Sequence, residues 1–173
     1  DGSVDYVLTS PPYLNAIDYM RGHRMSLIWL GHKYAALSST RSNSIGSERK
    51  PDSPVPAEIL DQVVAKMGDL EKLQARQRSM IERYIGDLHK MMSQVHRVLR
   101  DEGVATFVMG DSRLNGVLVS NSNGLAAVAS LVGMAEAKRF ERELPIQHRY
   151  LPTPEGGALG KRMRKETILT FRK

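Results

Sequence analysis

The sequence predicts an α/β domain with a partly parallel sheet, and three observations lead to this prediction. A short apolar run, Val4–Thr9, is stopped at once by two prolines, as expected for a buried strand. An apolar stripe at helical spacing over residues 77–100 ends before Gly103, and a second apolar run, residues 104–109, follows directly. A strand, a helix and a second strand in this order are typical of a βαβ unit, so the two strands are expected to be parallel.

Two further helical segments are expected between these strands. Residues 14–30 keep an approximate helical spacing of apolar side chains, and Gly31 is a suitable C-terminal stop. Residues 57–74 form a second apolar stripe. The polar residues 38–55 between them mix serines, prolines and charges and are expected to form a loop. We therefore interpret residues 38–75 as a loop and helical insertion within one domain that spans residues 1–173.

The residue pattern in the C-terminal third of the chain predicts one helix and two strands. The segment from Gly124 through Lys138 reads as a small, apolar helix suited to packing on a sheet. Residues 139–148 alternate loosely and predict an edge strand, because Pro145 is tolerated only at an edge. Residues 150–164 are rich in glycine and proline and predict a loop before the last strand, residues 166–171.

Length, charge and cysteine content narrow the functional class. The 173 residues carry a net charge of +6, which suits a polyanionic partner. The absence of cysteine excludes disulfides, thiolate metal sites and cysteine nucleophiles, and it agrees with a cytoplasmic location. No apolar run is long enough to predict a transmembrane helix, and no secretory leader is visible. The five histidines lack metal-ligand spacing, so no metal site is expected.

The turn Ser10-Pro11-Pro12-Tyr13 carries the most specific chemistry of the chain. Each proline fixes φ and removes an N–H donor, so the chain must leave the first strand in a stiff, extended turn. The hydroxyl oxygen of Ser10 and the carbonyl of Pro11 are suitable acceptors for the two hydrogens of a planar amino group, whose nitrogen would become more nucleophilic. Tyr13 offers a flat face on which a base could stack, worth about 1–3 kcal/mol.

Thr9-Ser10-Pro11-Pro12-Tyr13 resembles motif IV of the S-adenosylmethionine-dependent methyltransferases that act on exocyclic amino groups of DNA bases. The continuation through Tyr19 and the later Trp29-Leu30-Gly31 are similar to bacterial site-specific DNA methylases. The resemblance implies a partial Rossmann-like methyltransferase sheet from the motif IV strand onward, with an antiparallel C-terminal hairpin at its edge. It implies Ser10, Pro11, Pro12 and Tyr13 as catalytic residues, with Thr9 and Ser10 beside the cofactor. The serine favours cytosine N4 over adenine N6.

Other interpretations of this turn stay open. A proline-rich turn follows many strands, and four residues match by chance often. RNA or a protein glutamine could replace DNA as the methyl acceptor, since related turns hold planar amines and amides generally. A remnant that binds nucleic acid or a partner without catalysis is a further alternative.

The Gly-rich turn that holds the cofactor in this family is not found beside the motif. Residues 121–124 precede a helix but follow no strong strand, and residues 156–160 have the glycines without a strand before them, so each is interpreted as a surface turn. The chain therefore resembles the catalytic half of a methyltransferase, with the cofactor-binding half supplied in cis or in trans. Such a half would present an open sheet edge, which predicts a homodimer or a partner at that edge.

Several basic residues are candidates for contacts with DNA phosphates. Arg21 and Arg24 lie with His23 on the first helix, although a solvated helix face is the more ordinary interpretation of this cluster. A denser cluster of four cations follows the Gly-rich loop: Lys161, Arg162, Arg164 and Lys165. Trp29 is expected in the core or at an interface rather than on a base.

Overall fold

The computed structural model describes residues 1–14, 19–42, 44–45, 55–145 and 165–173. Its principal sheet has the strand order β1-β2-β6-β5, formed by β1 (Val4–Thr9), β2 (Leu99–Met109), β6 (Lys165–Arg172) and β5 (Ala135–Glu143). β1 and β2 are parallel, and the remaining neighbours are antiparallel. The predicted α/β class, the parallel pair and the antiparallel C-terminal hairpin at the sheet edge are confirmed.

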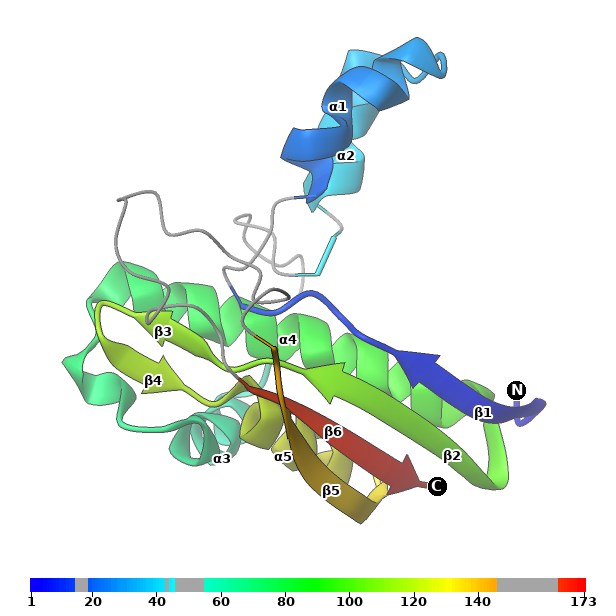
Figure 1. Ribbon diagram of the computed structural model, residues 1–173, viewed down its shortest axis with the longest axis vertical. Coiled ribbons are helices and arrows are strands. Elements are labelled where there is room, and N and C mark those ends of the chain that lie inside the picture. The colour runs from blue at the N-terminus through cyan, green and yellow to red at the C-terminus, as the bar shows by residue number, and fades with distance from the viewer. Residues whose placement is uncertain (15–18, 43, 46–54, 146–164) are drawn as a thin grey trace.

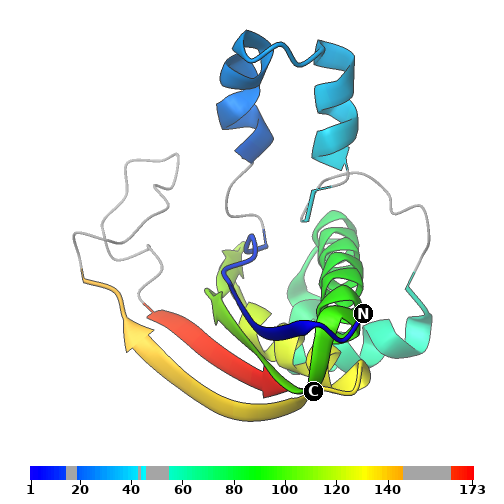
Figure 2. The same ribbon diagram turned by 90° about the vertical axis from the view of Figure 1, so that its right-hand side faces the viewer.

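Three helices cover one face of this sheet: α3 (Ala57–Met67), α4 (Ala75–Val98) and α5 (Asn121–Leu131) (Figures 1 and 2). α4 is the predicted crossover helix between the two parallel strands. The central strands β2 and β6 supply the fully buried side chains of the sheet, and Phe107 of β2 meets Phe171 of β6 edge to face with ring centroids 5.9 Å apart. An edge-to-face pair fits the ring quadrupoles and adds to the hydrophobic core.

The opposite face of the sheet is open. The register places Tyr6 beside Val104 and Leu8 beside Thr106, and both β1 side chains are exposed. Phe140, beside Ile168 at the other edge, is exposed as well. In the described part of the chain, this apolar face has no helix over it (Figure 2).

The two sheet edges differ in chemistry. β5, with the sequence Ala-Glu-Ala-Lys-Arg-Phe-Glu-Arg-Glu, is charged along its length and exposed at every residue. Charges on an edge strand discourage pairing with another chain. β1 forms the other edge, and its exposed side chains include Tyr6 and Leu8. β1, whose single charged residue is Asp5, is therefore the edge less protected against an added strand.

α1 (Tyr19–Trp29) and α2 (Tyr34–Ser42) form a hairpin that stands away from the sheet and its covering helices in both views (Figures 1 and 2). The predicted helix over residues 14–30 is confirmed for residues 19–29, and the predicted stop at Gly31 is confirmed by its φ of 88°. Leu14 is not helical but lies in a turn and packs into the core.

Residues 38–42 were expected in a loop, and this prediction is wrong. They belong to α2, which begins before them at Tyr34. The hydroxyl of Thr40 donates to the Ala36 carbonyl across 3.1 Å, so this side chain bonds within the helix rather than breaking it. Most of the remaining predicted loop, residues 43 and 46–54, lies outside the described residues.

The predicted helix over residues 57–74 is interrupted. α3 ends at Met67 because Gly68 has a φ of 126°, a conformation that other residues rarely adopt. A Cβ at this position would also lie 2.9 Å from the carbonyl oxygen of Leu118. A short 3₁₀ turn, η1 (Leu70–Lys72), follows. The buried side chains of this region belong to the core: Val63, Met67, Leu70 and Leu73.

The predicted helix over residues 124–138 is displaced toward the N-terminus. α5 ends at Leu131, and Gly133 takes a φ of 88°. The Met134 N–H then donates to the Ala129 carbonyl across 2.9 Å, which completes a Schellman motif. Gly133 was the available signal for this helix end.

The predicted strand over residues 139–148 is displaced in the same direction. β5 ends at Glu143, before Pro145, which therefore does not lie in the strand. Residues 146–148 of that prediction, and the predicted loop over residues 150–164, lie outside the described residues. The last strand is β6, two residues longer than predicted.

A second, two-stranded sheet was not predicted. β3 (Ser112–Leu114) and β4 (Val117–Val119) pair antiparallel around Asn115 and Gly116, which both have positive φ. Asn-Gly between two short runs is a strong signal for a tight hairpin turn.

No helix among the described residues is long and apolar enough to cross a membrane.

Candidate functional site

The Ser-Pro-Pro-Tyr turn lies at the carboxyl end of β1, beside the carboxyl end of β2. The hydroxyl of Ser10 donates to the Val108 carbonyl across 3.1 Å, and its oxygen lies 3.3 Å from the hydroxyl oxygen of Tyr13. Tyr13 in turn donates to Glu166 Oε1 on β6 across 3.3 Å. Residues far apart in the sequence, from the turn and from two strands, thus meet at the carboxyl end of the parallel strands, where α/β sheets bind ligands.

Each of these two hydroxyl groups has an acceptor besides its neighbour: the Val108 carbonyl for Ser10 and the Glu166 carboxylate for Tyr13. A serine or tyrosine hydroxyl has one hydrogen to donate and lone pairs to accept. When Ser10 donates to Val108 and Tyr13 donates to Glu166, both oxygens present lone pairs toward each other. An N–H group placed between them would find acceptors. Ser10 is exposed, so this acceptor can be reached from solvent.

The second proposed acceptor, the Pro11 carbonyl, accepts no hydrogen bond from any described residue. Pro11 is buried, whereas Ser10 beside it is exposed. Both prolines keep the peptide groups of this turn out of any ladder, because they cannot donate. The turn therefore holds one exposed and one buried acceptor in a stiff backbone.

Tyr84 of α4 holds the turn in place through a hydrogen bond. Its hydroxyl donates to the Pro12 carbonyl across 3.0 Å, and its ring is fully buried. Burial raises the pKa of Tyr84 above its ordinary value, and charges on Tyr13, Asp87 and Asp111 would raise it further. Tyr84 is therefore a neutral donor at any physiological pH, and it ties the turn to the core.

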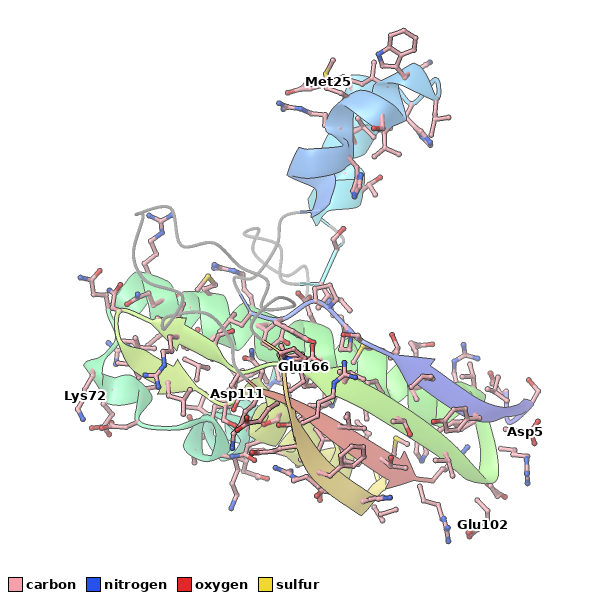
Figure 3. The ribbon with its side chains drawn as sticks, viewed as in Figure 1. Asp5, Met25, Lys72, Glu102, Asp111 and Glu166 are labelled. Carbon is pink, nitrogen blue, oxygen red and sulfur yellow. The ribbon has the colours of Figure 1, made fainter. Side chains whose placement is uncertain are left out.

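Glu166 and Arg142 hold the hydroxyl end of Tyr13. The guanidinium of Arg142 donates to Glu166 Oε2 through Nε at 2.9 Å and through Nη2 at 2.6 Å, which leaves Oε1 for Tyr13. Arg142 and Glu166 are direct partners in the β5–β6 register. Figure 3 shows Glu166 near the centre of the side-chain cluster, at the end of the sheet from which the turn emerges. The ring of Tyr13 is thus oriented through its hydroxyl.

A buried polar network supports the other side of the turn. Asn121, the first residue of α5, is fully buried and donates to the Gly110 carbonyl and the Ser112 hydroxyl, each across 2.8 Å. Ser112 passes its own hydrogen to the Leu14 carbonyl across 2.7 Å. Leu14 directly follows Tyr13, so the network connects α5 to the end of the motif.

Residues 121–124 were interpreted as a surface turn, and this is wrong. Asn121, Ser122 and Gly124 are buried in the first turn of α5. Asp111 accepts hydrogen bonds of 3.1 Å from both the N–H and the hydroxyl of Ser122. This helix N-terminus is therefore already occupied by a carboxylate of the chain and does not fit a phosphate or a cofactor carboxylate.

The hydrogen-bond acceptors among the described residues suit a planar amino group better than they suit the predicted cofactor, S-adenosylmethionine. Thr9, proposed beside the cofactor, is half-buried at the end of β1, and Ser10 follows it. Across the part of the chain that the structure covers, no Gly-rich turn lies after a strand of the principal sheet; the other candidate, residues 156–160, lies outside it. The described part of the site therefore offers acceptors and a flat ring, without a Gly-rich turn beside them.

The structure places the described candidates for DNA contacts on two different elements, α1 and β6. Arg24 is exposed on α1, and its guanidinium carbon lies 5.9 Å from the centroid of the Tyr34 ring. Arg21 lies in α1 as well. Lys165 was expected on a loop but begins β6, where it pairs with Glu141 at 3.0 Å, and this pairing raises the pKa of Lys165. The other three, Lys161, Arg162 and Arg164, lie outside the described residues.

Sequence reasoning missed the residues that support the turn. Tyr84, Glu166 and Asn121 come from three elements distant in sequence, and no local spacing connects them with residues 10–13. Tyr84 belongs to the apolar stripe of α4 and was read only as core. A buried tyrosine needs a partner for its hydroxyl, which was a signal that it contacts backbone.

Comparisons with known proteins found similarity to solved structures. No protein-family model matches the chain, and no curated protein matches it. Two solved structures of one protein from Thermus thermophilus, described as a candidate DNA modification methylase, are similar to it. Its complex with S-adenosyl-L-methionine is 19% identical over 100% of this chain with a TM-score of 0.49. The selenomethionine derivative is 21% identical over 54% of this chain with a TM-score of 0.40. This chain covers 48% and 38% of those two chains, less than half the length of that protein.

Proposed function

We propose that this chain positions an exocyclic amino group of a DNA base for methylation by S-adenosyl-L-methionine. The observation that carries the proposal is the acceptor pair of the Ser-Pro-Pro-Tyr turn. Ser10 donates its hydrogen to Val108, which leaves lone pairs of an exposed hydroxyl to accept, and Pro11 adds a carbonyl that accepts no hydrogen bond from a described residue. The resemblance of this turn to motif IV supports the same chemistry.

The role of each residue follows from its hydrogen bonding. The Ser10 oxygen and the Pro11 carbonyl accept the two amino hydrogens, which favours a nitrogen lone pair that is less conjugated with the ring. Pro12 holds the turn through Tyr84. The ring of Tyr13 stacks on the base while Glu166 fixes its hydroxyl. A base in duplex DNA must leave the stack to reach such a turn.

S-adenosyl-L-methionine supplies a methyl group on a sulfonium, and the reaction is a simple displacement. The amino nitrogen forms a bond to the methyl carbon as the carbon–sulfur bond breaks. The nitrogen then releases one proton to solvent. Alignment of nitrogen, carbon and sulfur matters more here than an acid or a base, which agrees with a turn built from acceptors and a stacking ring. This donor is also the compound bound in the Thermus structure.

Cytosine N4 is the acceptor that we favour over adenine N6. The favoured choice follows from serine as the first residue of the motif, because the serine form resembles the cytosine-specific members of the family. RNA and protein glutamine remain alternative acceptors with the same planar N–H₂ geometry. Analysis of the methylated product distinguishes all four.

The open face and edge of β1 support a second part of the proposal. Tyr6 and Leu8 are exposed on an uncovered face, and the strand that carries them is a sheet edge with a single charged residue, Asp5. We propose that further strands and helices complete the sheet here and supply most contacts to the cofactor, in cis or from another chain. A homodimer through this edge is the alternative arrangement.

Methyl transfer can be tested with a radiolabelled methyl donor. The protein is incubated with tritiated S-adenosyl-L-methionine and DNA oligonucleotides, and the nucleosides are separated and identified by mass. We expect N4-methylcytosine, and we expect the double variant Ser10→Ala with Tyr13→Ala to abolish it. The matched control is Ser79→Ala, which removes a serine hydroxyl from the exposed surface of α4, away from the turn and from the open edge of β1.

Three results would each refute a part of this assignment. Activity that survives in the Ser10→Ala and Tyr13→Ala variant would remove the turn from the site. Calorimetry that detects no S-adenosyl-L-methionine binding, either by this chain alone or with a separately supplied cofactor-binding half, would favour the non-catalytic remnant. Light scattering that shows a stable monomer would refute the homodimer.

A further inference from the structure

Large apolar side chains at the end of the α1–α2 hairpin, which we call the tip, are mostly exposed to solvent. Trp29 is 86% exposed and Leu30 is 76% exposed, and Met25 and Tyr34 beside them are also exposed. Figure 3 shows Met25 at the far end of the hairpin, away from the sheet. Trp29 was expected in the core or at an interface, and the core position is wrong. So many exposed large apolar side chains in one place are typical of an interaction surface.

The exposure of this tip is built into the backbone. The His32 N–H donates to the Leu27 carbonyl across 3.0 Å and the Gly31 N–H donates to the Ile28 carbonyl across 2.9 Å, which is a Schellman motif with Gly31 in the left-handed region. The motif ends α1 sharply and turns the chain back into α2. Trp29 and Leu30 directly precede the glycine, so they occupy the bend of the hairpin.

The charge around this tip has one sign. From Tyr19 to Ile45 the chain contains no aspartate or glutamate, whereas it contains the cations Arg21, Arg24, Lys33 and Arg41. Lys33 is exposed, as is Arg24, and the guanidinium of Arg24 lies over the ring of Tyr34. The aromatic ring and the cation therefore lie on the same surface.

A second copy of the chain is a poor occupant for this tip. Two identical tips would bring like charges together without any acidic side chain in either segment to neutralise them. A polyanion with flat apolar faces is complementary to both features, because cations bind its phosphates and aromatic rings stack on its bases. Nucleic acid has this combination.

We propose that the tip of the α1–α2 hairpin is a DNA-binding element: Arg24 and Lys33 contact phosphates, and Trp29 and Leu30 pack against bases. The inference rests on the proposed function, since it takes the same DNA as its ligand. It adds a second contact, remote from the Ser-Pro-Pro-Tyr turn, that holds the DNA while one base is presented to Ser10. Stacking residues would favour DNA that is locally unpaired.

Trp29 is the single tryptophan of the chain, so its fluorescence reports on this tip alone. We expect a labelled oligonucleotide to bind in an anisotropy titration, and the same DNA to quench the Trp29 emission and protect it from iodide. DNA that binds without any change in the Trp29 signal would overturn the inference. A Ser79→Ala variant, changed at an exposed position of α4 with no proposed role, should give the same titration.

Two double variants separate the contributions of charge and stacking. Arg24→Ala with Lys33→Ala should weaken DNA binding about tenfold or more and reduce the slope of log affinity against log salt by about 2. The matched control, Arg76→Ala with Arg78→Ala, removes two exposed cations from the start of α4 and should change the affinity less than twofold. Trp29→Ala with Leu30→Ala should weaken binding about fivefold or more with an unchanged salt slope.

The outcomes distinguish this inference from the proposed function. Hairpin variants that bind DNA as the unaltered protein does overturn the inference and leave methyl transfer standing. Sedimentation that shows a dimer abolished by Trp29→Ala with Leu30→Ala would instead assign the tip to a second copy. Protein that binds no DNA overturns the inference, and the methyl-transfer assay with RNA or peptide acceptors then decides whether the proposed chemistry survives. Circular dichroism melting checks that each variant is folded.

Discussion

The hydroxyl of Tyr84 donates a hydrogen bond to the carbonyl of Pro12 across 3.0 Å, from the middle of α4 to the motif at the end of β1. The two residues are 72 positions apart, and the contact lies beneath the turn proposed to hold the amino group. A carbonyl that follows two prolines has no neighbouring ladder to satisfy it. A buried side chain of the core thus supplies the hydrogen bond that the backbone of this turn cannot make for itself.

Tyr84→Phe should lower the free energy of unfolding by about 1–2 kcal/mol. The change keeps the buried ring but removes the donor, which leaves the Pro12 carbonyl without its partner. Urea unfolding followed by circular dichroism measures the loss. The control is Tyr6→Phe on the open face of the sheet, where we expect a change within about 0.5 kcal/mol. An equal loss in both variants would mean that the hydrogen bond adds no stability.

The same residue predicts a dependence of stability on alkaline pH. Burial raises the pKa of Tyr84 in the folded protein above its ordinary value of 10.0, so the folded state holds the proton more tightly than the unfolded state. The resulting stabilisation is complete below pH 10 and is lost as the pH rises above 10, by about 1.4 kcal/mol per pH unit. Urea unfolding between pH 9 and 11.5 should therefore show a steeper decline in the unaltered protein than in Tyr84→Phe. Parallel declines would contradict the assignment, because both proteins share all the other titrating groups.

Two glutamates of the β5–β6 hairpin should differ in their contribution to stability. The Glu166 side chain is 13% exposed and bonds both Arg142 and Tyr13, whereas the Glu141 side chain is 58% exposed and pairs with Lys165. We expect Glu166→Gln to cost about 1 kcal/mol and Glu141→Gln to cost less than about 0.5 kcal/mol, because solvent screens the exposed pair. Urea denaturation of the two variants is the measurement. A larger loss in Glu141→Gln would show that the hairpin, not the contact with Tyr13, depends on these charges.

Asn121→Ala should be among the more destabilising single changes in this chain. It leaves the Gly110 carbonyl without a donor and removes the partner of the Ser112 hydroxyl, for a cost of about 2–3 kcal/mol. Asn121→Asp should cost more, since a buried carboxylate would face the Gly110 carbonyl. The neighbouring Asn123→Ala is the control: its side chain is exposed and bonds only Arg139 at the surface, so the loss should stay below about 0.5 kcal/mol. Thermal melting of all three variants tests the order.

The parts of the fold that the sequence could predict are those encoded by local periodicity. The apolar stripe of α4 and the apolar runs of β1, β2 and β6 were long enough to identify each element, and their order implied a parallel pair. The errors fall where single residues decide a boundary. Gly68 and Gly133 each ended a helix through a positive φ that the hydrophobic pattern does not record. Asn115-Gly116 built a hairpin too short to show any periodicity.

By itself the sequence determined that a stiff turn rich in acceptors follows the first strand, because two prolines stand between a serine and a tyrosine. Only the tertiary structure decided how that turn is used. It directs the Ser10 hydrogen to Val108, fixes Pro12 through Tyr84 and orients Tyr13 through Glu166, and these partners lie between 72 and 153 positions away in sequence. It also placed Trp29 on an exposed hairpin tip rather than in the core. Local backbone preferences act over a few residues, whereas hydrogen-bond partners and burial depend on which distant segments the sheet brings together.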